Sequence, residues 1–414
     1  MKRLALCALV GLAAAACQSD RVAGPSSPGA AAVDDALAAS RGWGDAYRLP
    51  WGDEGLRVMQ YNLYLGTNFT PIFEAAQSGD QVALLTALVL GYGELQQSSF
   101  PARAGKIAAQ VGKVRPDVMG IEEVALWSVS EPYDPTQPPL VPFAVKYDFL
   151  QILLDSLAAR GLTYAAPAVD TTSDVAVPVP TDFDVQGNPT AFALVRFQDR
   201  DAVLVRAGVR YRDPQHGVYA AAAPVSIAGQ DLAIKNGWSS VLVTREGRTV
   251  RFAATHLNAE AGVVNYAQGQ ELVEVLKQVH DPVVLVGDFN TGPGVGSDFA
   301  PTYALFTGAR FTDLWPVAHP HDPGLTNGPL DGVGALDASG VLVPYPTLTF
   351  TTRVDLVWLR DRFGRADDVH AAIFGNQQTD RTAAGLWPSD HAAVGMAFDL
   401  PDYFARHDEH RDRW

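Results

Sequence analysis

Residues 282–290 read PVVLVGDFN, and this stretch is the most informative in the 414-residue chain. Its first half is a short run rich in β-branched residues, which is typical of a β-strand. Its second half carries Asp288 and Asn290 at the point where the apolar run ends. Because a rigid sheet can hold side chains at its strand ends toward one cleft, the stretch predicts a core strand that delivers polar groups to a functional site.

Other parts of the chain repeat this strand pattern and alternate with helical periods. Eight further apolar runs have strand length and β-branched content, at 57–65, 116–124, 191–197, 202–209, 239–245, 249–257, 353–359 and 392–398. Apolar residues recur with helical spacing in 101–115, 145–160 and 265–280. Helices separate some strands, and a short turn at 245–248 joins two others as a hairpin.

This mixed order predicts the fold class. We expect an α/β (α+β) protein, a four-layer α/β sandwich of two packed mixed β-sheets flanked by helices, rather than a doubly wound parallel sheet. Residues 165–190 and 316–348 are rich in turn-forming residues and are predicted to be long loops.

Polar residues interrupt or end the apolar runs at recurring places. They are Asn62, Glu122, Glu123, His256, Asp288, Asn290, Asp355, Asp390 and His391. Carboxylate and amide oxygens with imidazoles, and no thiols, suit a hard cation such as Mg²⁺ or Mn²⁺. The set therefore predicts a divalent-metal site at the ends of several strands.

Each of these residues alone also has a structural interpretation. Asp355 could pair with Arg353, and Asp288 could form an Asx turn. Since strand neighbours face opposite ways, one of Glu122 and Glu123 is expected to point away from the site. His256 alone could be an ordinary core histidine. The occurrence of all the polar residues in one order favours a functional site.

That order resembles the endonuclease/exonuclease/phosphatase superfamily, the metal-dependent phosphoesterases related to pancreatic-type deoxyribonuclease and bacterial sphingomyelinases. The resemblance spans residues 56–400 and implies one large domain. It is carried by Asn62 on the first strand, PDVMGIEEV (116–124), THLN (255–258), GDFN (287–290), RVDLVW (353–358) and Ser389-Asp390-His391.

The resemblance implies a role for each matched residue. Asn62, Glu123 and Asp390 would bind the metal. Asp288 would orient or deprotonate the attacking water, and Asn290 would hold the phosphoryl oxygens. His391, oriented by Asp355, and His256 would stabilise charge and move protons at the phosphate, as the chemistry of a resistant anion requires.

The chain also departs from the family pattern. Glu122 stands where the family has Gln, and Tyr64 stands where several nuclease branches have Asp. Asp201 lies in the stretch that departs most and is only a weak site candidate. Tyr64, Asn68 and Trp238 are expected to serve packing more than the cleft.

The composition restricts the function further. The chain is 47% hydrophobic and 19% charged, which excludes a disordered polymer. A net charge of −15 disfavours a broad nucleic-acid groove, although nucleic acid is not excluded as a partner. The only cysteines, Cys7 and Cys17, lie near the N-terminus, so the rest of the chain has no thiolate metal site.

The first residues predict a targeting segment. Lys2 and Arg3 precede an apolar run, 4–16, that is too short to cross a membrane. The run ends in small residues before Cys17 and resembles a bacterial lipoprotein signal, with simple secretion as the alternative. We therefore expect a signal peptide at 1–17, lipidation of Cys17, and the cell envelope as location, at the outer membrane if there are two membranes.

The remaining boundaries follow from composition. We predict that residues 18–50 form a flexible tether, that residues 51–401 form the catalytic domain, and that residues 402–414 form a charged tail. The expected protein is monomeric and contacts a membrane only through its lipid.

Several functions agree with these observations. The favoured one is a lipid-tethered, Mg²⁺- or Mn²⁺-dependent phosphoester hydrolase, most simply a phosphodiesterase. A nuclease or a sphingomyelinase-like phospholipase of the same fold remains an alternative, as do small sugar or inositol phosphates as substrates. A surface binding module without turnover is the alternative from another class.

Overall fold

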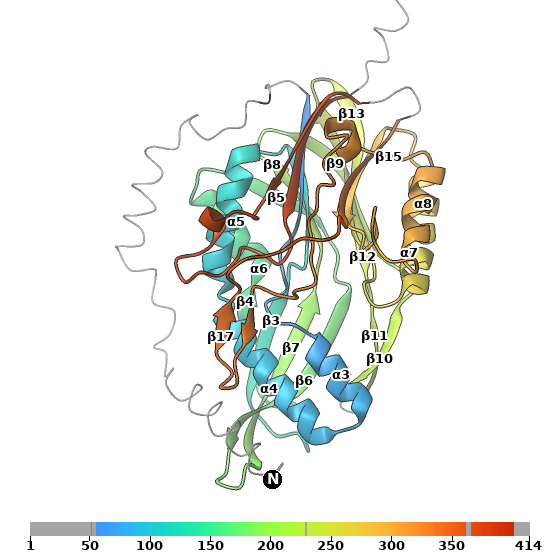
Figure 1. The fold of residues 1–414 in the computed structure, drawn as a ribbon. Coiled ribbons are helices and arrows are strands. Elements are labelled where there is room, and N and C mark those ends of the chain that lie inside the picture. Colours follow the sequence, from blue (N-terminus) through green and yellow to red (C-terminus); the bar gives the residue numbers. More distant parts are fainter. Residues whose placement is uncertain (1–50, 52–54, 228–229, 362–365, 401–414) are drawn as a thin grey trace, which may run out of the picture.

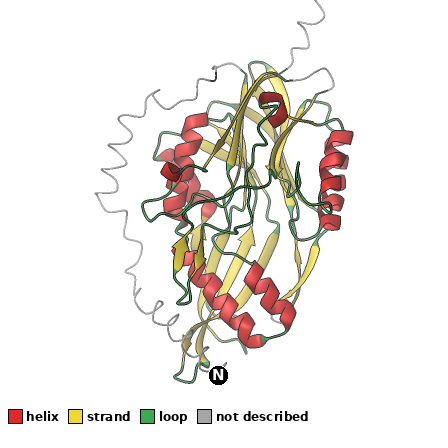
Figure 2. Cartoon of the chain, viewed as in Figure 1, coloured by secondary structure: helices red, strands yellow, loops and turns green. Residues whose placement is uncertain are grey.

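The computed structural model describes residues 51, 55–227, 230–361 and 366–400, which form two large β-sheets between layers of helices (Figures 1 and 2). The predicted signal peptide at 1–17 with Cys17, the tether at 18–50 and the tail at 402–414 all lie outside the described residues. They therefore stay predictions.

The first sheet has six strands and contains both the beginning and the end of the described chain. Its only parallel pair is β1 with β2. The strand order is β19 (Asp367–Phe374), β20 (Ala393–Asp399), β1 (Leu56–Asn62), β2 (Val118–Glu122), β8 (Ala202–Arg206) and β5 (Tyr164–Val169).

The second sheet also has six strands, and its parallel pair is β13 with β14. Its hairpin between β12 and β13 turns at Glu246 and Gly247, both with positive φ, as the sequence predicted. The strand order is β15 (Thr312–Asp313), β18 (Asp355–Arg360), β14 (Val283–Asp288), β13 (Arg248–His256), β12 (Gly237–Arg245) and β9 (Arg210–Val218).

The helices cover the outer faces of the two sheets. In Figure 1, α5 (Phe100–Val114) and α6 (Phe149–Ala158) lie on one side, and α7 (Gly262–Lys277) and α8 (Ala300–Gly308) on the other. Separate apolar clusters join each helix layer to its sheet. The predicted helices 101–115, 145–160 and 265–280 correspond to α5, α6 and α7, although residues 144–148 form strand β4 ahead of α6.

A third apolar cluster joins the two sheets face to face. On β1, Val58 belongs to this inter-sheet cluster whereas Met59 packs toward the helices, because alternate residues of a strand face opposite ways. On β2, a Cβ at Gly120 would lie 2.7 Å from side-chain atoms of both Ala254 and Val286 in the other sheet. The layers are thus helix, sheet, sheet and helix, and the predicted α/β sandwich is confirmed.

A smaller sheet corrects one prediction from the sequence. Residues 165–190, expected to be a long loop, contain most of β5, all of β6 and the start of β7. Pro178 and Pro180 hide the strand pattern, but β6 lies at the edge of its sheet, where a missing N–H is tolerated. The order of this sheet is β4 (Ala144–Asp148), β3 (Leu126–Tyr133), β7 (Pro189–Asp199) and β6 (Ser173–Phe183).

The remaining elements are short and lie around this core. Helices α3 (Thr70–Ser78) and α4 (Gln81–Gln97) pack on each other, and α4 contacts β6. The predicted loop at 316–348 contains the end of α9 (Trp315–Ala318) and the hairpin of β16 (Gly334–Leu336) and β17 (Leu342–Pro344). A second hairpin pairs β10 (Ala223–Ile227) with β11 (Gln230–Ile234), and Gln378–Asp380 form a 3₁₀ turn. Among the described residues, every helix is too short or too polar to span a bilayer.

Candidate active site

The polar site residues continue the apolar rows that join the two sheets. On β1, for example, Val58 is followed on the same face by Gln60 and Asn62. On β14, Val286 is followed in the same way by Asp288. Each strand therefore changes from apolar to polar at the same end of the sandwich.

Strand pairing then places these ends side by side. In the second sheet, His256 pairs in register with Asp288, and Asp288 pairs with Asp355. In the first sheet, Asn62 pairs with Glu122. Residues that are up to 329 positions apart, from Asn62 to His391, consequently surround one cleft between the sheets.

Asp355 and His391 form a hydrogen-bonded pair. His391 Nδ1 lies 2.9 Å from Asp355 Oδ2, and both side chains are buried. Arg353, which could have competed for Asp355, instead forms an ion pair with Asp313 at 2.7 Å. Although burial alone would lower the pKa of His391, the carboxylates of Asp355 and Asp288 raise that pKa well above its ordinary value. The imidazole is thus held in one orientation and favoured in its protonated form.

The other ring nitrogen of His391 contacts a residue that the sequence did not indicate. Asn327 Nδ2 lies 2.6 Å from His391 Nε2. Asn327 belongs to the long segment between α9 and β18, where no strand pattern marks a functional position. The amide nitrogen can donate to Nε2 only when that atom carries no proton, so protonation of the ring requires the Asn327 amide to turn its oxygen toward Nε2 or to move away.

Asp288 lies at the centre of the cleft. Its Oδ2 accepts a hydrogen bond from Asn62 Nδ2 at 3.1 Å. The same oxygen lies 3.7 Å from His391 Nε2 and 3.8 Å from His256 Nε2. Three nitrogen atoms from three strands or strand ends therefore face one carboxylate oxygen.

Asn290 is positioned by the turn after β14. It adopts a left-handed φ of 49°, and its backbone N–H donates to Asp288 Oδ1 at 2.9 Å. Its side-chain nitrogen donates to the carbonyl of Leu257, which follows His256 in the neighbouring strand. The turn thus fixes Asp288 and Asn290 together.

Glu122 and Glu123 take different directions, but not through strand alternation alone. Glu122 is the last residue of β2 and points between the sheets, where it is fully buried. Glu123 follows the strand with a left-handed φ of 59°. Its carboxylate accepts from Asn62 Nδ2 at 2.8 Å and from the backbone N–H of Leu65 at 2.8 Å, so it faces the cleft.

Glu122 connects to the catalytic pair through Gln60. Gln60 Nε2 donates to Glu122 Oε2 at 2.9 Å and to Asp355 Oδ1 at 2.7 Å. Burial, followed by the charges of Asp355 and Asp288, raises the pKa of Glu122 well above its ordinary value. Gln60 lies within strand β1 at what looks like a core position, so no pattern in the sequence indicates this bridge.

Two sets of side chains could hold a cation. Ligand atoms of Asp288, Asp355 and His391 lie within 4.8 Å of one another. In that set, however, both ring nitrogens of His391 and both oxygens of Asp355 already have hydrogen-bond partners. The second set consists of Asn62, Glu123 and Asp390.

The second set has the electrostatics of a cation site. Burial, with the nearby charge of Asp390, raises the pKa of Glu123 to about 7. The charge of Asp390 disfavours ionisation of Glu123, and a divalent cation held by these groups would offset that repulsion. Oxygen donors of this kind suit Mg²⁺ or Mn²⁺. The oxygens of Asn62, Glu123 and Asp390 also accept hydrogen bonds within the protein, so existing partners do not distinguish the two sets.

Arg103 holds the loops that carry this second set. The side chain is fully buried on α5 and donates to the carbonyls of Leu63 and Pro388 through Nη1, at 2.7 and 2.8 Å. It also donates to the carbonyls of Tyr64 and Ser98. The guanidinium therefore ties the end of β1 to the loop that leads into Asp390 and His391, a role that the sequence did not indicate.

His256 is backed by further buried acids. Its Nδ1 lies 3.9 Å from Asp201 Oδ1, and the backbone N–H of Glu123 donates to that same oxygen. Asp201 packs against Asp170, whose pKa is raised to about 7, mainly by burial. Asp201, a weak candidate from the sequence, thus lies directly behind the cleft.

Tyr64, Asn68 and Trp238 serve mainly packing and loop structure. Tyr64 is buried and donates to Glu94 at 2.6 Å, and Trp238 packs against the cluster beneath α7. Asn68 lies 3.5 Å from Asp331 through its side-chain nitrogen.

Comparisons with known proteins give similarity at the level of structure only. No family model matches the chain, and no curated protein matches it. Similar solved structures include D. rerio TDP2 complexed with a single-strand DNA product, with 15% identity, a TM-score of 0.47, and coverage of 84% of this chain and 100% of that one.

Two bacterial structures are similar to a comparable extent. An endonuclease/exonuclease/phosphatase family protein from Leptotrichia buccalis has 12% identity and a TM-score of 0.44, over 83% of this chain and 100% of that chain. A mannosyl-6-phosphatase from Bacteroides thetaiotaomicron has 15% identity and a TM-score of 0.41, with coverage of 83% and 100%. At these identities the likeness concerns the fold alone.

Proposed function

We propose that this chain is a divalent-metal-dependent phosphoester hydrolase, and most specifically a phosphodiesterase that directs water at phosphorus. One observation carries the proposal. Asp288 Oδ2 is faced by Asn62, His256 and His391, beside the buried Asp355–His391 pair.

The geometry at Asp288 suits water activation. The separations of 3.7 and 3.8 Å from its Oδ2 to the two imidazoles exceed a hydrogen bond, and a contact of this length can be bridged by one small polar group. Asp288 would accept a proton from water bound there, since a carboxylate within hydrogen-bond reach can act as a general base. Asn62, which donates to the same oxygen, keeps the carboxylate in place.

His391 would supply positive charge where a phosphoester needs it. A phosphodiester is an anion, and its transition state concentrates further charge on oxygen, so preorganised donors contribute much of the rate. His391, held by Asp355 and favoured in its protonated form, would donate from Nε2 to a phosphoryl or leaving oxygen once the Asn327 amide has released that atom. His256 would act from the other side, and Asn290 would contact the phosphoryl oxygens.

The metal would be held by Glu123 and Asp390 with help from Asn62. When bound, it would supply Lewis-acid stabilisation of the phosphoryl group. The identity of the cation as Mg²⁺ or Mn²⁺ rests on the oxygen donors of this set. Arg103 would keep the two loops that carry these donors at a fixed separation.

The cellular location is also a proposal. Lys2, Arg3 and the apolar run before Cys17 support export and lipidation at Cys17, with the folded domain tethered outside the cytoplasm. Replacement of Cys17 by Ser should move the protein from the membrane to a soluble fraction or leave an uncleaved precursor. Unchanged membrane partitioning would favour simple secretion.

A substrate panel tests the enzymatic proposal. Bis-p-nitrophenyl phosphate, p-nitrophenyl phosphate, plasmid DNA and sphingomyelin would each be incubated with Mg²⁺ and with EDTA. We expect turnover of at least one ester that requires the cation and is lost in the His391→Ala variant. Absence of turnover on every phosphoester would favour the binding-module alternative, and full activity in EDTA would refute metal dependence.

A further inference from the structure

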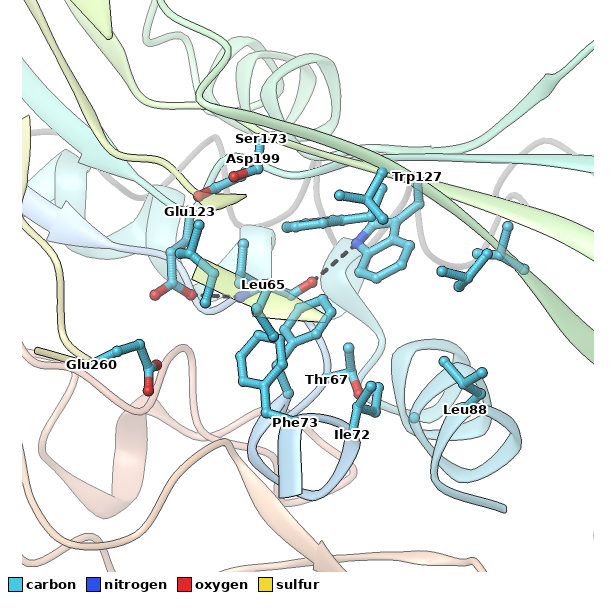
Figure 3. A pocket seen from close by; sticks show the side chains of 18 of the residues that line it. Leu65, Thr67, Ile72, Phe73, Leu88, Glu123, Trp127, Ser173, Asp199 and Glu260 are labelled. Carbon is cyan, nitrogen blue, oxygen red and sulfur yellow. Dashed lines mark hydrogen bonds between the residues drawn. The ribbon is translucent and has the colours of Figure 1, made fainter. Parts of the chain in front are cut away.

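A cavity of about 230 Å³ opens beside the proposed catalytic groups. It lies between helices α3 and α4 on one side and strands β6 and β7 on the other. Figure 3 shows the carboxylates of Glu123, Asp199 and Glu260 at one end and Trp127, Phe73 and Leu88 toward the other. His256 also lines the polar end, so the cavity begins at the catalytic cleft.

The far end of the cavity has an apolar wall made of strand residues. Val175, Val177 and Val179 line it from β6, and Val195 and Phe197 line it from β7. Alternate residues of a strand share one face, so these two strands present a continuous apolar surface to the cavity. The wall is therefore a built feature of the smaller sheet.

Aromatic rings complete this wall. Phe69 stacks on Trp127 with ring centroids 6.2 Å apart, and Phe197 lies 5.0 Å from Phe69 and 4.7 Å from Trp127. The Nε1–H of Trp127 donates to the carbonyl of Leu65, another lining residue, at 3.1 Å (Figure 3). The indole thus contributes its apolar ring to the wall while its polar group is satisfied.

The size of the cavity restricts what can enter it. An apolar cavity of about 150 Å³ accepts benzene, which corresponds to about 25 Å³ per carbon atom. At that ratio, about 230 Å³ accommodates roughly nine carbon atoms. One aromatic ring with a short extension, or a short alkyl segment, is of this size, whereas a complete lipid chain is longer.

We propose that this cavity binds an apolar substituent of the substrate, so that the chain hydrolyses hydrophobic phosphoesters in preference to sugar phosphates. The inference rests on the proposed function and specifies its substrate class. With the phosphorus between Asp288 and the histidines, an apolar group esterified to it can extend past Glu123 and His256 toward Trp127 and Phe197. The net charge of −15 favours a small ester over a polyanion at this site.

The test measures binding separately from turnover. Isothermal titration calorimetry, with Mg²⁺ present, would give dissociation constants for methyl-, butyl-, hexyl-, octyl- and dodecylphosphonate. Each buried methylene should tighten binding about fourfold. We expect this gain up to about octyl, and a much smaller gain from octyl to dodecyl. A dissociation constant independent of chain length would overturn the proposal.

Two variants and a control connect the gain to this cavity. Val177→Trp should fill the cavity and abolish most of the dependence on chain length. Val145→Trp, at an exposed position of the same small sheet, should leave that dependence unchanged. If Val177→Trp does not fold, Phe73→Ala enlarges the cavity and should move the levelling point to longer chains. An unchanged chain-length dependence in a folded Val177→Trp or Phe73→Ala variant would refute the assignment.

The outcomes also separate this inference from the proposed function. Chain-length-dependent binding without turnover of any ester would retain the cavity assignment and refute the hydrolase. Turnover with chain-length-independent binding would retain the hydrolase and refute the hydrophobic substrate class.

Discussion

The buried Asp355–His391 pair makes a quantitative prediction about catalysis. His391→Ala and Asp355→Asn would be prepared singly and together, and kcat/KM measured on whichever ester the substrate panel identifies. His391 Nδ1 and Asp355 Oδ2 are 2.9 Å apart, and Asp355 as a whole residue is only 1% exposed. A hydrogen bond to a charged group in such a place contributes about 1.5–3 kcal/mol.

These contacts set the expected losses. His391→Ala removes the donor itself and should lower kcat/KM by about 10³-fold or more, which corresponds to roughly 4 kcal/mol. Asp355→Asn removes the carboxylate that orients and charges the ring, and should cost about 10- to 100-fold alone. Once His391 is absent, Asp355 has no ring to orient. The double variant should therefore be within about threefold of His391→Ala, because residues that act as a unit are not additive.

A matched control comes from the neighbouring ion pair. Asp313 is also a buried acid, but it pairs with Arg353 and does not contact His391. Asp313→Asn should lower the stability of the fold, and its effect on kcat/KM should add to that of His391→Ala. Circular dichroism would confirm that every variant is folded. Additive losses for Asp355→Asn and His391→Ala would refute the pairing even if the hydrolase assignment stood.

Three further predictions concern other groups of the cleft. Glu123→Gln should abolish most of the rise in Tm that Mg²⁺ causes, as measured by differential scanning fluorimetry. Glu122→Gln should change that rise little, because the raised pKa of Glu122 already favours a neutral carboxyl. The reverse ranking of the two variants would contradict the proposed metal site. Asn327→Ala removes a contact worth roughly 1–1.5 kcal/mol and should lower kcat, measured from initial rates, by about tenfold. An unchanged kcat would show that Asn327 is dispensable. Burial raises the pKa of Asp170 to about 7, from about 4 in the unfolded chain. The protonated Asp170 side chain therefore contributes fully to the free energy of unfolding below about pH 4, and this contribution is lost as the pH rises through 7. The three-unit shift in pKa corresponds to about 4 kcal/mol. In Asp170→Asn, the free energy of unfolding, measured by urea denaturation, should therefore decrease less between about pH 4 and pH 7 than in the unchanged protein. A decrease of equal size in the variant would refute this.

The sequence predicted those parts of the molecule that follow a local pattern. Buried strands show as apolar runs, and a polar residue that ends such a run is visible without a structure. Asp288, Asp355 and His256 were identified in this way, and strand register then places them side by side. Their assigned roles stay predictions, because proximity alone does not test them.

The residues that the sequence did not identify lack such a pattern. Gln60 reads as a core position of β1, and its bridging contacts depend on a residue 295 positions away. Asn327 lies in an irregular segment, and Arg103 reads as an ordinary basic residue of an amphipathic helix. Only the packing of both sheets shows that each contacts the cleft. Strand β6 was missed for a local reason, since its prolines are acceptable only at a sheet edge.

The position of β1 between β20 and β2 has a consequence for the synthesis of the protein. A ribosome completes β1 more than 300 residues before it reaches β20, and at about 5–20 residues per second this takes on the order of 15 to 60 s. Throughout that interval β1 lacks one of its neighbours, and an unpaired strand edge is prone to association with other chains. Asp390 and His391 immediately precede β20, so the last strand among the described residues both covers this edge and brings Asp390 and His391 to the cleft. The nascent chain therefore stays without its complete active site until β20 has been translated, and we expect it to need protection from aggregation for the same period.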